Sequence, residues 1–146
     1  MGTIFSAYDI RGRLGETLTT EYAWTVGRAF AEWLPTEGTI VLATSVGADA
    51  KTAHAVVEGI LLQGRGVVGA GEGDEQAVKG TIIDTHAAGG VLIAHDDTQN
   101  IEIITLFDAN GVTVTLEQGL DTIEELITAG NFVPAAEKGE TITYSS

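Results

Sequence analysis

The stretch TIVLATSVGADAKTAHAVVEGILLQGRGVV, residues 39–68, holds a strand, a helix and a second strand in succession. Its first apolar run, residues 40–43, is short and continuous, which is typical of a central strand covered by helices on both faces. Asp49 then begins a segment with apolar residues at helical spacing, and Gly64 stands where a helix commonly ends in a left-handed residue. The stretch therefore predicts a parallel β-α-β unit.

The same alternation of strands and helices continues on both sides of this unit. Thr20 is placed to cap a helix over residues 21–34, Asp74 is placed to cap another, and residues 90–94 read as a further buried strand. We expect five or six strands and four helices in the chain. The predicted fold is a three-layer α/β/α sandwich around a mostly parallel mixed sheet.

An antiparallel hairpin is expected at the edge of that sheet. The runs 101–107 and 112–116 flank Asn110-Gly111, a strong local signal for a two-residue turn. A last helix is expected over residues 117–129, and Gly130 ends it. We therefore interpret residues 1–130 as one domain and residues 131–146 as a C-terminal tail with a short extended piece.

Composition narrows the classes of function. The chain has 146 residues, a formal net charge of -14 and no cysteine. Such a charge repels nucleic acid, and the absence of thiols removes disulfides, thiolate zinc sites and a cysteine nucleophile. With no apolar run near the length of a membrane span and no signal-like start, we expect a cytoplasmic protein without a membrane partner.

Three segments carry a resemblance to a known family. Ala7-Tyr8-Asp9-Ile10-Arg11-Gly12 near the N-terminus is followed, in order, by Gly89-Gly90-Val91-Leu92-Ile93 and Leu106-Phe107-Asp108-Ala109-Asn110-Gly111. This series resembles the first domain of the α-D-phosphohexomutases, the phosphomannomutase/phosphoglucomutase family. The resemblance spans nearly the whole chain and makes the tail the counterpart of the linker to the second domain.

The loop that carries phosphate in this family differs here. The family pattern Thr-Ala-Ser-His-Asn-Pro lies between the Gly-Gly-Val and Leu-Phe strands, where this chain has Ala94-His95-Asp96-Asp97-Thr98-Gln99-Asn100. Depending on the position of a one-residue gap, the serine is replaced by His95 or by Asp96. Neither has a hydroxyl group, so we expect no catalytic residue at this position.

The resemblance also suggests ligand-binding residues. It implies that Arg11, with Tyr8 and Asp9, faces the phosphate loop, and a guanidinium suits phosphate bidentately. The alternative is that Asp9 and Arg11 form an ion pair that ties down the first loop. Asp96 and Asp97 are weak candidates for metal ligands and His95 for a covalent phosphate carrier, against the simpler interpretation of an exposed acidic loop.

These observations leave three hypotheses for function. The first is an inactive, stand-alone homologue of domain I that binds a protein partner or forms a homo-oligomer, most simply a dimer. The second is a component of a phosphoglucomutase/phosphomannomutase, an intramolecular hexose phosphotransferase that needs its other domains. The third is a sugar-phosphate sensor that uses Arg11. No cofactor is expected in the first case, and Mg²⁺ is expected only if the family chemistry persists.

Overall fold

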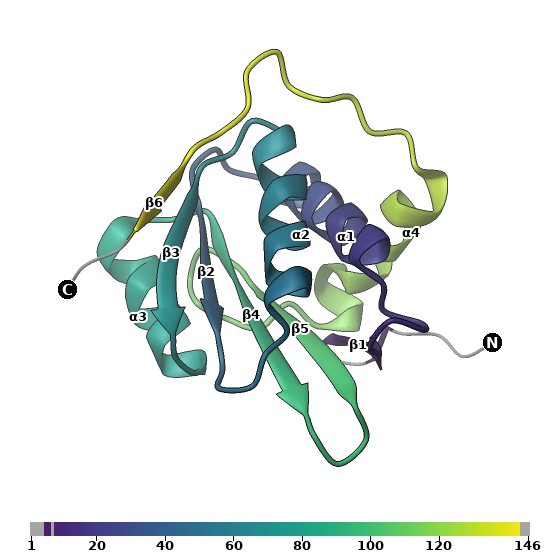
Figure 1. The fold of residues 1–146 in the computed structure, drawn as a ribbon. Helices are drawn as coiled ribbons and strands as arrows, with labels where there is room; N and C mark the ends of the chain where they lie inside the picture. The colour runs from purple at the N-terminus through teal and green to yellow at the C-terminus, as the bar shows by residue number, and fades with distance from the viewer. Residues whose placement is uncertain (1–4, 7, 144–146) are drawn as a thin grey trace.

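The predicted β-α-β unit lies at the centre of the computed structural model, which describes residues 5–6 and 8–143 (Figure 1). Strand β2 (Ile40–Thr44) leads through α2 (Ala50–Leu62) to β3 (Val67–Glu72), and the two strands pair in parallel. Asp49 caps α2 by accepting a hydrogen bond from the Thr52 amide. The cap and the parallel pairing are as the sequence predicts.

Within the described residues the sheet has six strands in the order β1-β5-β4-β2-β3-β6. Strand β4 (Gly89–Asp96) and β6 (Thr141–Thr143) extend the parallel part on either side of β2 and β3. Strand β5 (Ile101–Phe107) runs antiparallel to β4, and β1 (Ile10–Arg13) runs antiparallel to β5. The mixed, mostly parallel sheet with an antiparallel edge is confirmed.

Helices cover both faces of this sheet and form the three predicted layers (Figure 1). Helix α1 (Thr20–Trp33) and α2 pack over one face, where the larger core includes Phe30, Ile60 and Ile104. Helix α3 (Glu75–Thr85) covers part of the other face, with Val78 and Ile82 against Val41 and Phe107. Strands β2, β3 and β4 therefore bury side chains in two directions, which explains their apolar sequences.

Helices α1 and α2 cross closely at two glycines. A Cβ atom at Gly27 would overlap the carbonyl oxygen of Val56, and one at Gly59 would overlap the carbonyl oxygen of Trp24. Both glycines are buried. The backbones of the two helices thus touch where a side chain would hold them apart.

Two local predictions are wrong in detail. Helix α1 is capped by Thr19, whose hydroxyl accepts from the Tyr22 amide, and not by Thr20. The turn at Gly111 (φ 77°) forms, but residues 112–116 make only a bridge from Thr113 to Phe107. Strand β5 instead forms its longer pairings with β4 over residues 101–107 and with β1 over residues 101–104.

The last predicted helix is present in two pieces. A π-helical turn, η1 (Leu116–Leu120), precedes α4 (Asp121–Ala129). Gly119, at φ 156°, lies against the Trp33 ring, where a side chain would overlap the indole. Leu120 and Ile123 point inward as predicted.

The C-terminal segment is more ordered than a simple tail. It crosses the end of α2, where the amides of Ala135 and Gly139 donate to the carbonyls of Leu62 and Leu61. It then adds β6 to the edge of the sheet beside β3, as the yellow strand in Figure 1 shows. Residues 144–146 of the predicted tail lie outside the described residues.

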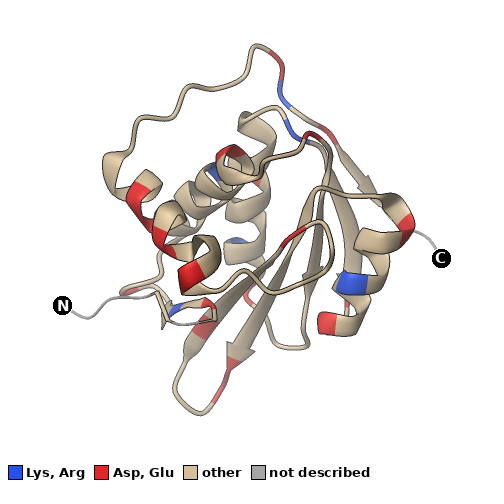
Figure 2. Cartoon of the chain, turned by 180° about the vertical axis from the view of Figure 1, so that it is seen from behind, with Lys and Arg blue, Asp and Glu red and all other residues tan. Residues whose placement is uncertain are grey.

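Acidic residues, red in the cartoon of Figure 2, occur on many helices, strands and loops, whereas the seven basic residues occupy few places. Across residues 5–6 and 8–143, no helix is both long and apolar enough to pass through a membrane.

Candidate functional site

The candidate site lies at the carboxyl ends of β2 and β4. From β2 the chain passes into α2 on one face of the sheet, and from β4 it turns back within the sheet into the neighbouring strand β5. In open α/β sheets, ligands commonly bind beyond the carboxyl ends of the parallel strands. The loop with His95, Asp96 and Asp97 begins at the carboxyl end of β4.

The register of β4 and β5 separates His95 from Asp96. His95 pairs with Glu102 and Asp96 pairs with Ile101, and successive side chains of a strand point to opposite faces. His95 therefore lies on the face covered by α1 and α2, and Asp96 on the other face. The two residues that compete for the family's serine position thus have different surroundings.

His95 bonds to a buried carboxylate. Its Nδ1 lies 2.6 Å from Oε1 of Glu102, and Glu102 is fully buried. The Asp49 amide donates to Oε2 of the same carboxylate at 2.6 Å, while the Asp49 side chain caps α2. The carboxylate of Glu102 thus joins the end of β4 to the N-terminus of α2, and both of its oxygens accept a hydrogen bond, as a buried charge requires.

The bond to Glu102 raises the pKa of His95. Partial burial opposes this rise, but the charges of Glu102, Asp97 and Asp96 add to it. Only 12% of the His95 side chain is exposed, and its Nε2 lies 3.3 Å from Oδ1 of Asp97. The imidazole is thus held on the Nδ1 side by a fixed group and on the Nε2 side by a residue of the loop.

Glu102 was not among the candidate residues. A signal for it is present in the sequence, since a single charged residue interrupts the apolar run of β5 at an inward position. The alternation of residue types along β5 does not say which of its faces is buried. The buried position of Glu102 can therefore be recognised only once the register of β5 with its neighbours is known.

Asp9 and Arg11 form the ion pair that was one of their two interpretations. Arg11 donates from Nε and Nη2 to the two carboxylate oxygens of Asp9 at 2.9 and 2.8 Å, and the Ser6 hydroxyl donates to Asp9 Oδ1 at 2.6 Å. Burial alone would raise the pKa of Asp9, but these bonds and the Arg11 charge outweigh it and leave the pKa lowered. The two guanidinium donors of Arg11 that would bind a phosphate are bonded to the carboxylate of Asp9 instead.

Arg11 nevertheless lies near the loop that follows β4. It pairs in register with Ile103, on the same face as Asp96. The hydrogen bonds that Arg11 donates to Asp9 raise the pKa of Arg11, and the charge of Asp96 adds to that rise. Half of the Arg11 side chain is exposed.

Tyr8 lies apart from this pair. Its side chain is exposed and lines a hollow of about 280 Å³ with Thr115, Leu116 and Glu117, at the start of η1. The structure therefore brings Arg11 and Asp9 together and turns Tyr8 toward another segment.

Asp96 and Asp97 do not form a metal site with their neighbours. Asp96 Oδ1 accepts from the Thr98 amide within the turn, and the Asp97 side chain is 93% exposed. Over the part of the chain that the structure describes, no three His, Cys, Asp or Glu residues gather around a common point. Mg²⁺ needs several converging oxygens, so the described residues of this domain do not fit that ion.

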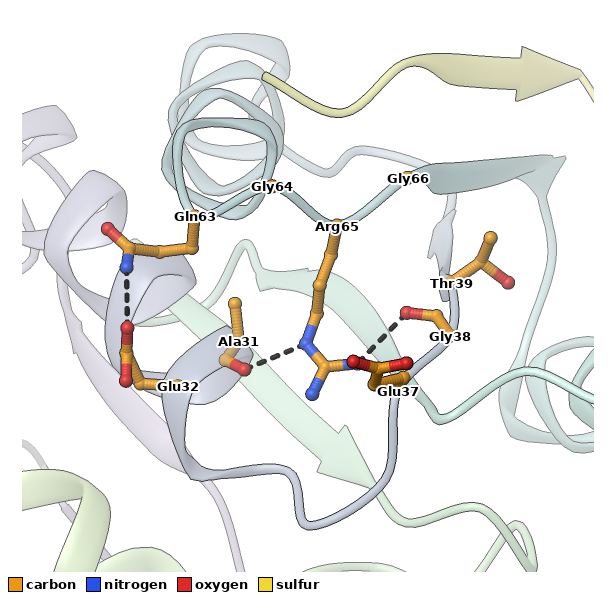
Figure 3. Close-up of a pocket in the computed structure, with 9 residues that line it drawn as sticks. All are labelled: Ala31, Glu32, Glu37, Gly38, Thr39, Gln63, Gly64, Arg65 and Gly66. Carbon is orange, nitrogen blue, oxygen red and sulfur yellow. Dashed lines mark hydrogen bonds between the residues drawn. The ribbon is translucent and has the colours of Figure 1, made fainter. Parts of the chain in front are cut away.

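A hollow of about 510 Å³ lies at the opposite end of the sheet, where β2 and β3 begin (Figure 3). Arg65 projects into it and donates to the carbonyl oxygens of Ala31, Gly38 and Leu34 at 2.7, 2.9 and 3.1 Å. Burial lowers the pKa of Arg65, partly offset by Glu32 and Glu37. All three nitrogens of the guanidinium satisfy the end of α1 and the segment after it, so the hollow serves the fold rather than a ligand.

The chain is thus an α/β/α domain whose candidate site lies in the loops at the carboxyl ends of its parallel strands. The sequence profile of the phosphoglucomutase/phosphomannomutase alpha/beta/alpha domain I matches residues 2–134. The chain belongs to this family and corresponds to its domain I.

Two individual relatives support the assignment of this chain to the family. The chain is 30% identical over 137 residues to a phosphomannomutase of Salmonella typhimurium, covering 92% of this chain and 30% of that protein. It is 28% identical over 138 residues to a phosphoglucomutase/phosphomannomutase of Thermococcus kodakarensis, covering 90% of this chain and 30% of that protein. The chain thus spans less than a third of the length of these relatives.

Solved structures show the same fold. A phosphoglucomutase/phosphomannomutase family protein from Burkholderia thailandensis superposes with a TM-score of 0.81 at 21% identity, over 97% of this chain and 33% of that one. A putative phosphomannomutase from Thermus thermophilus gives a TM-score of 0.78 at 22% identity, over 99% of this chain and 34% of that one.

Proposed function

We propose that this chain is a phosphohexomutase domain I that no longer carries phosphate on a serine and acts as a binding module. The observation that carries the proposal is the bond network of His95, Glu102 and Asp49 at the end of β4. A mutase phosphate carrier of the serine type needs a hydroxyl oxygen there. This chain offers an imidazole tied to a buried carboxylate instead.

The geometry around Arg11 supports the same proposal. A phosphate-binding arginine must present its paired donors to the ligand. Here the Nε and Nη2 donors meet Asp9, and the neighbouring Asp96 adds negative charge where a phosphate would lie. A sugar phosphate would have to displace Asp9 and overcome that repulsion.

A mutase assay of the isolated chain tests this proposal. The chain is incubated with hexose 1-phosphate, Mg²⁺ and hexose 1,6-bisphosphate, and hexose 6-phosphate is measured beside a full-length phosphomannomutase as positive control. We expect no product above the blank. Turnover that stays with the chain through purification would overturn the proposal.

Self-association is the binding role that we propose first. Among the described residues, six large apolar side chains are more than half exposed: Tyr8, Val46, Ile83, Val112, Val133 and Ile142. Pairing of two copies would cover part of this surface, and added salt should favour it by screening the net charge of -14. Light scattering across micromolar concentrations should show a dimer, and a monomer at every concentration and salt level would contradict it.

A second candidate is a component of a phosphoglucomutase/phosphomannomutase. It is favoured by the share of the relatives that the chain covers, since about 70% of their length has no counterpart here. The test is to add the remaining domains of a phosphomannomutase, as a separate chain or by fusion. Restored turnover would favour this candidate, with Mg²⁺ held by the added domains.

A sugar-phosphate sensor is the third candidate, because half of the Arg11 side chain is open to solvent. Titration with glucose 6-phosphate and mannose 6-phosphate, followed by NMR, should leave the amides from Tyr8 to Arg11 unshifted if the binding-module proposal holds. The cytoplasm remains the location that we propose, supported by the absence of cysteine.

A further inference from the structure

The described residues include one histidine whose ring is held in place by a fully buried carboxylate. That residue is His95, and its partner Glu102 is itself fixed by the Asp49 amide. We propose that His95 is a phosphoryl-acceptor site, at which Nε2 takes a phosphoryl group from an acyl phosphate or a phosphoramidate. This goes beyond the proposed binding role and does not need turnover of a hexose phosphate.

The orientation of the ring is the first argument. Oε2 of Glu102 accepts from the Asp49 amide, and an ionised carboxylate can only accept, so with Glu102 ionised the proton between the two side chains is on Nδ1 of His95. The lone pair of the neutral ring is then on Nε2. A carboxylate that fixes the tautomer in this way is the usual means of preparing an imidazole to react through its other nitrogen.

Access to Nε2 is the second argument. The neighbour on that side is Asp97, 3.3 Å away, and its side chain is 93% exposed. It can therefore turn into solvent without breaking any packing. Asp96, the other acidic residue of the loop, points to the opposite face of the sheet, so its carboxylate does not stand in front of the ring.

The chemistry is balanced without a metal ion. With an acyl phosphate, the Nε2 lone pair attacks phosphorus and forms the N–P bond, while the P–O bond to the acyl group breaks and its electron pair leaves on the carboxylate. No proton is required by this leaving group. The ring keeps its Nδ1 proton and gains positive charge, which the carboxylate of Glu102 opposes at 2.6 Å.

A phosphoramidate reacts at the same atom with a different leaving group. The P–N bond of the donor breaks as the bond to Nε2 forms, and its electron pair leaves on nitrogen. The donor nitrogen carries the extra proton of its zwitterionic form, so it departs as neutral ammonia. Neither donor therefore needs an oxidant, a reductant or a further reactant.

The chain offers its own controls for a labelling experiment. It has three histidines, and both His54 on α2 and His86 at the end of α3 are exposed. If exposure decided reactivity, these two would be labelled before His95. We expect the reverse order when the chain is treated with acetyl phosphate or phosphoramidate and analysed by intact mass, ³¹P NMR and peptide mapping.

The expected product is one phosphoryl group at His95, stable in base and lost in acid. His95→Gln should abolish it. Labelling in proportion to exposure, labelling of Asp96 or Asp97, or no labelling would each overturn the proposal.

Two further variants separate the role of Glu102 from a general loss of structure. Glu102→Gln keeps the size of the side chain and removes its charge, and should slow labelling of His95 roughly ten- to a hundredfold while circular dichroism stays unchanged. Asp97→Asn should label at least as fast as the parent, because it removes a negative charge near the incoming phosphate. Loss of labelling in Asp97→Asn would show that Asp97 accepts the group and would contradict the proposal.

Discussion

The Nδ1 atom of His95 lies 2.6 Å from the carboxylate of Glu102, across neighbouring antiparallel strands. The same carboxylate also accepts a hydrogen bond from the backbone amide of Asp49, the residue that caps α2. Glu102 therefore connects the end of β4 to the start of α2. The loop that carries phosphate in the family is therefore tied in this chain to the helix beside it.

Glu102→Ala should lower the free energy of unfolding by about 3 kcal/mol, because it leaves partly buried donors on His95 and Asp49 without an acceptor. Urea denaturation measures the change. Glu125→Ala, at an exposed position of α4, is the matched control and should stay within about 0.5 kcal/mol of the parent. Equal effects of the two substitutions would show that the network adds no stability.

Stability should fall as the pH rises above the pKa of the free imidazole. The pKa of His95 is raised from 6.5 in the folded chain by its bond to Glu102, so the folded state holds a proton that the unfolded state has already lost. The contribution of this group is complete below pH 6.5 and disappears as the pH passes the raised pKa. Denaturation at a series of pH values should show this fall in the parent and not in His95→Gln, and identical profiles would refute it.

The bidentate pair of Asp9 and Arg11 should contribute about 1 kcal/mol, since Arg11 is half exposed and its charge is screened by solvent. Arg11→Lys should lose most of this contribution, because an ammonium group cannot form the same fork. The contribution should also disappear in acid as the pH falls through the lowered pKa of Asp9. A double-mutant cycle with Asp9→Asn measures the coupling, with Arg13→Ala, in a long exposed pair with Glu16, as the control. No coupling between positions 9 and 11 would contradict the prediction.

Glycine substitutions should distinguish close packing from helix propensity. Gly59→Ala should destabilise the fold by about 3 kcal/mol or more, because its Cβ would overlap the backbone of α1 at Trp24. Gly80→Ala in α3 has nothing within 4 Å of the new atom and should stabilise it by about 0.5–1 kcal/mol. Thermal unfolding of both variants tests the pair, and a tolerated alanine at Gly59 would show that α1 and α2 can move apart.

Arg65→Ala should cost about 2–3 kcal/mol, because three carbonyl oxygens at and beyond the end of α1 would lose a charged donor. Arg65→Lys should recover only part of this loss. Lys138→Ala, whose long contact with Glu58 is exposed, is the control and should change little. If Arg65→Lys unfolds at the same urea concentration as the parent, the three hydrogen bonds of the guanidinium are not what stabilises the fold at this position.

Much of the fold could be predicted from local sequence. Asp49 and Asp74 cap their helices as expected, since a cap depends on neighbours a few residues away. The pairing of β5 was predicted only in part: the turn at Asn110-Gly111 forms and brings Thr113 beside Phe107, but the longer pairings are with β4, just before it in the chain, and with the distant β1.

The candidate site was only partly predictable. Asp9 and Arg11 are two residues apart, so their pairing was among the interpretations of the sequence alone. Whether His95 or Asp96 faces the helices could not be decided before the register was known, and Glu102 was missed for the same reason.

The order of strands and helices, the family resemblance and the lack of a serine over residues 94–100 follow from residue types and short-range spacing alone. The tertiary structure alone decided which residue of the loop meets the buried carboxylate of Glu102. The physical reason is the two-residue period of a strand: a shift of one position in the pairing would turn His95 outward and Asp96 toward α2.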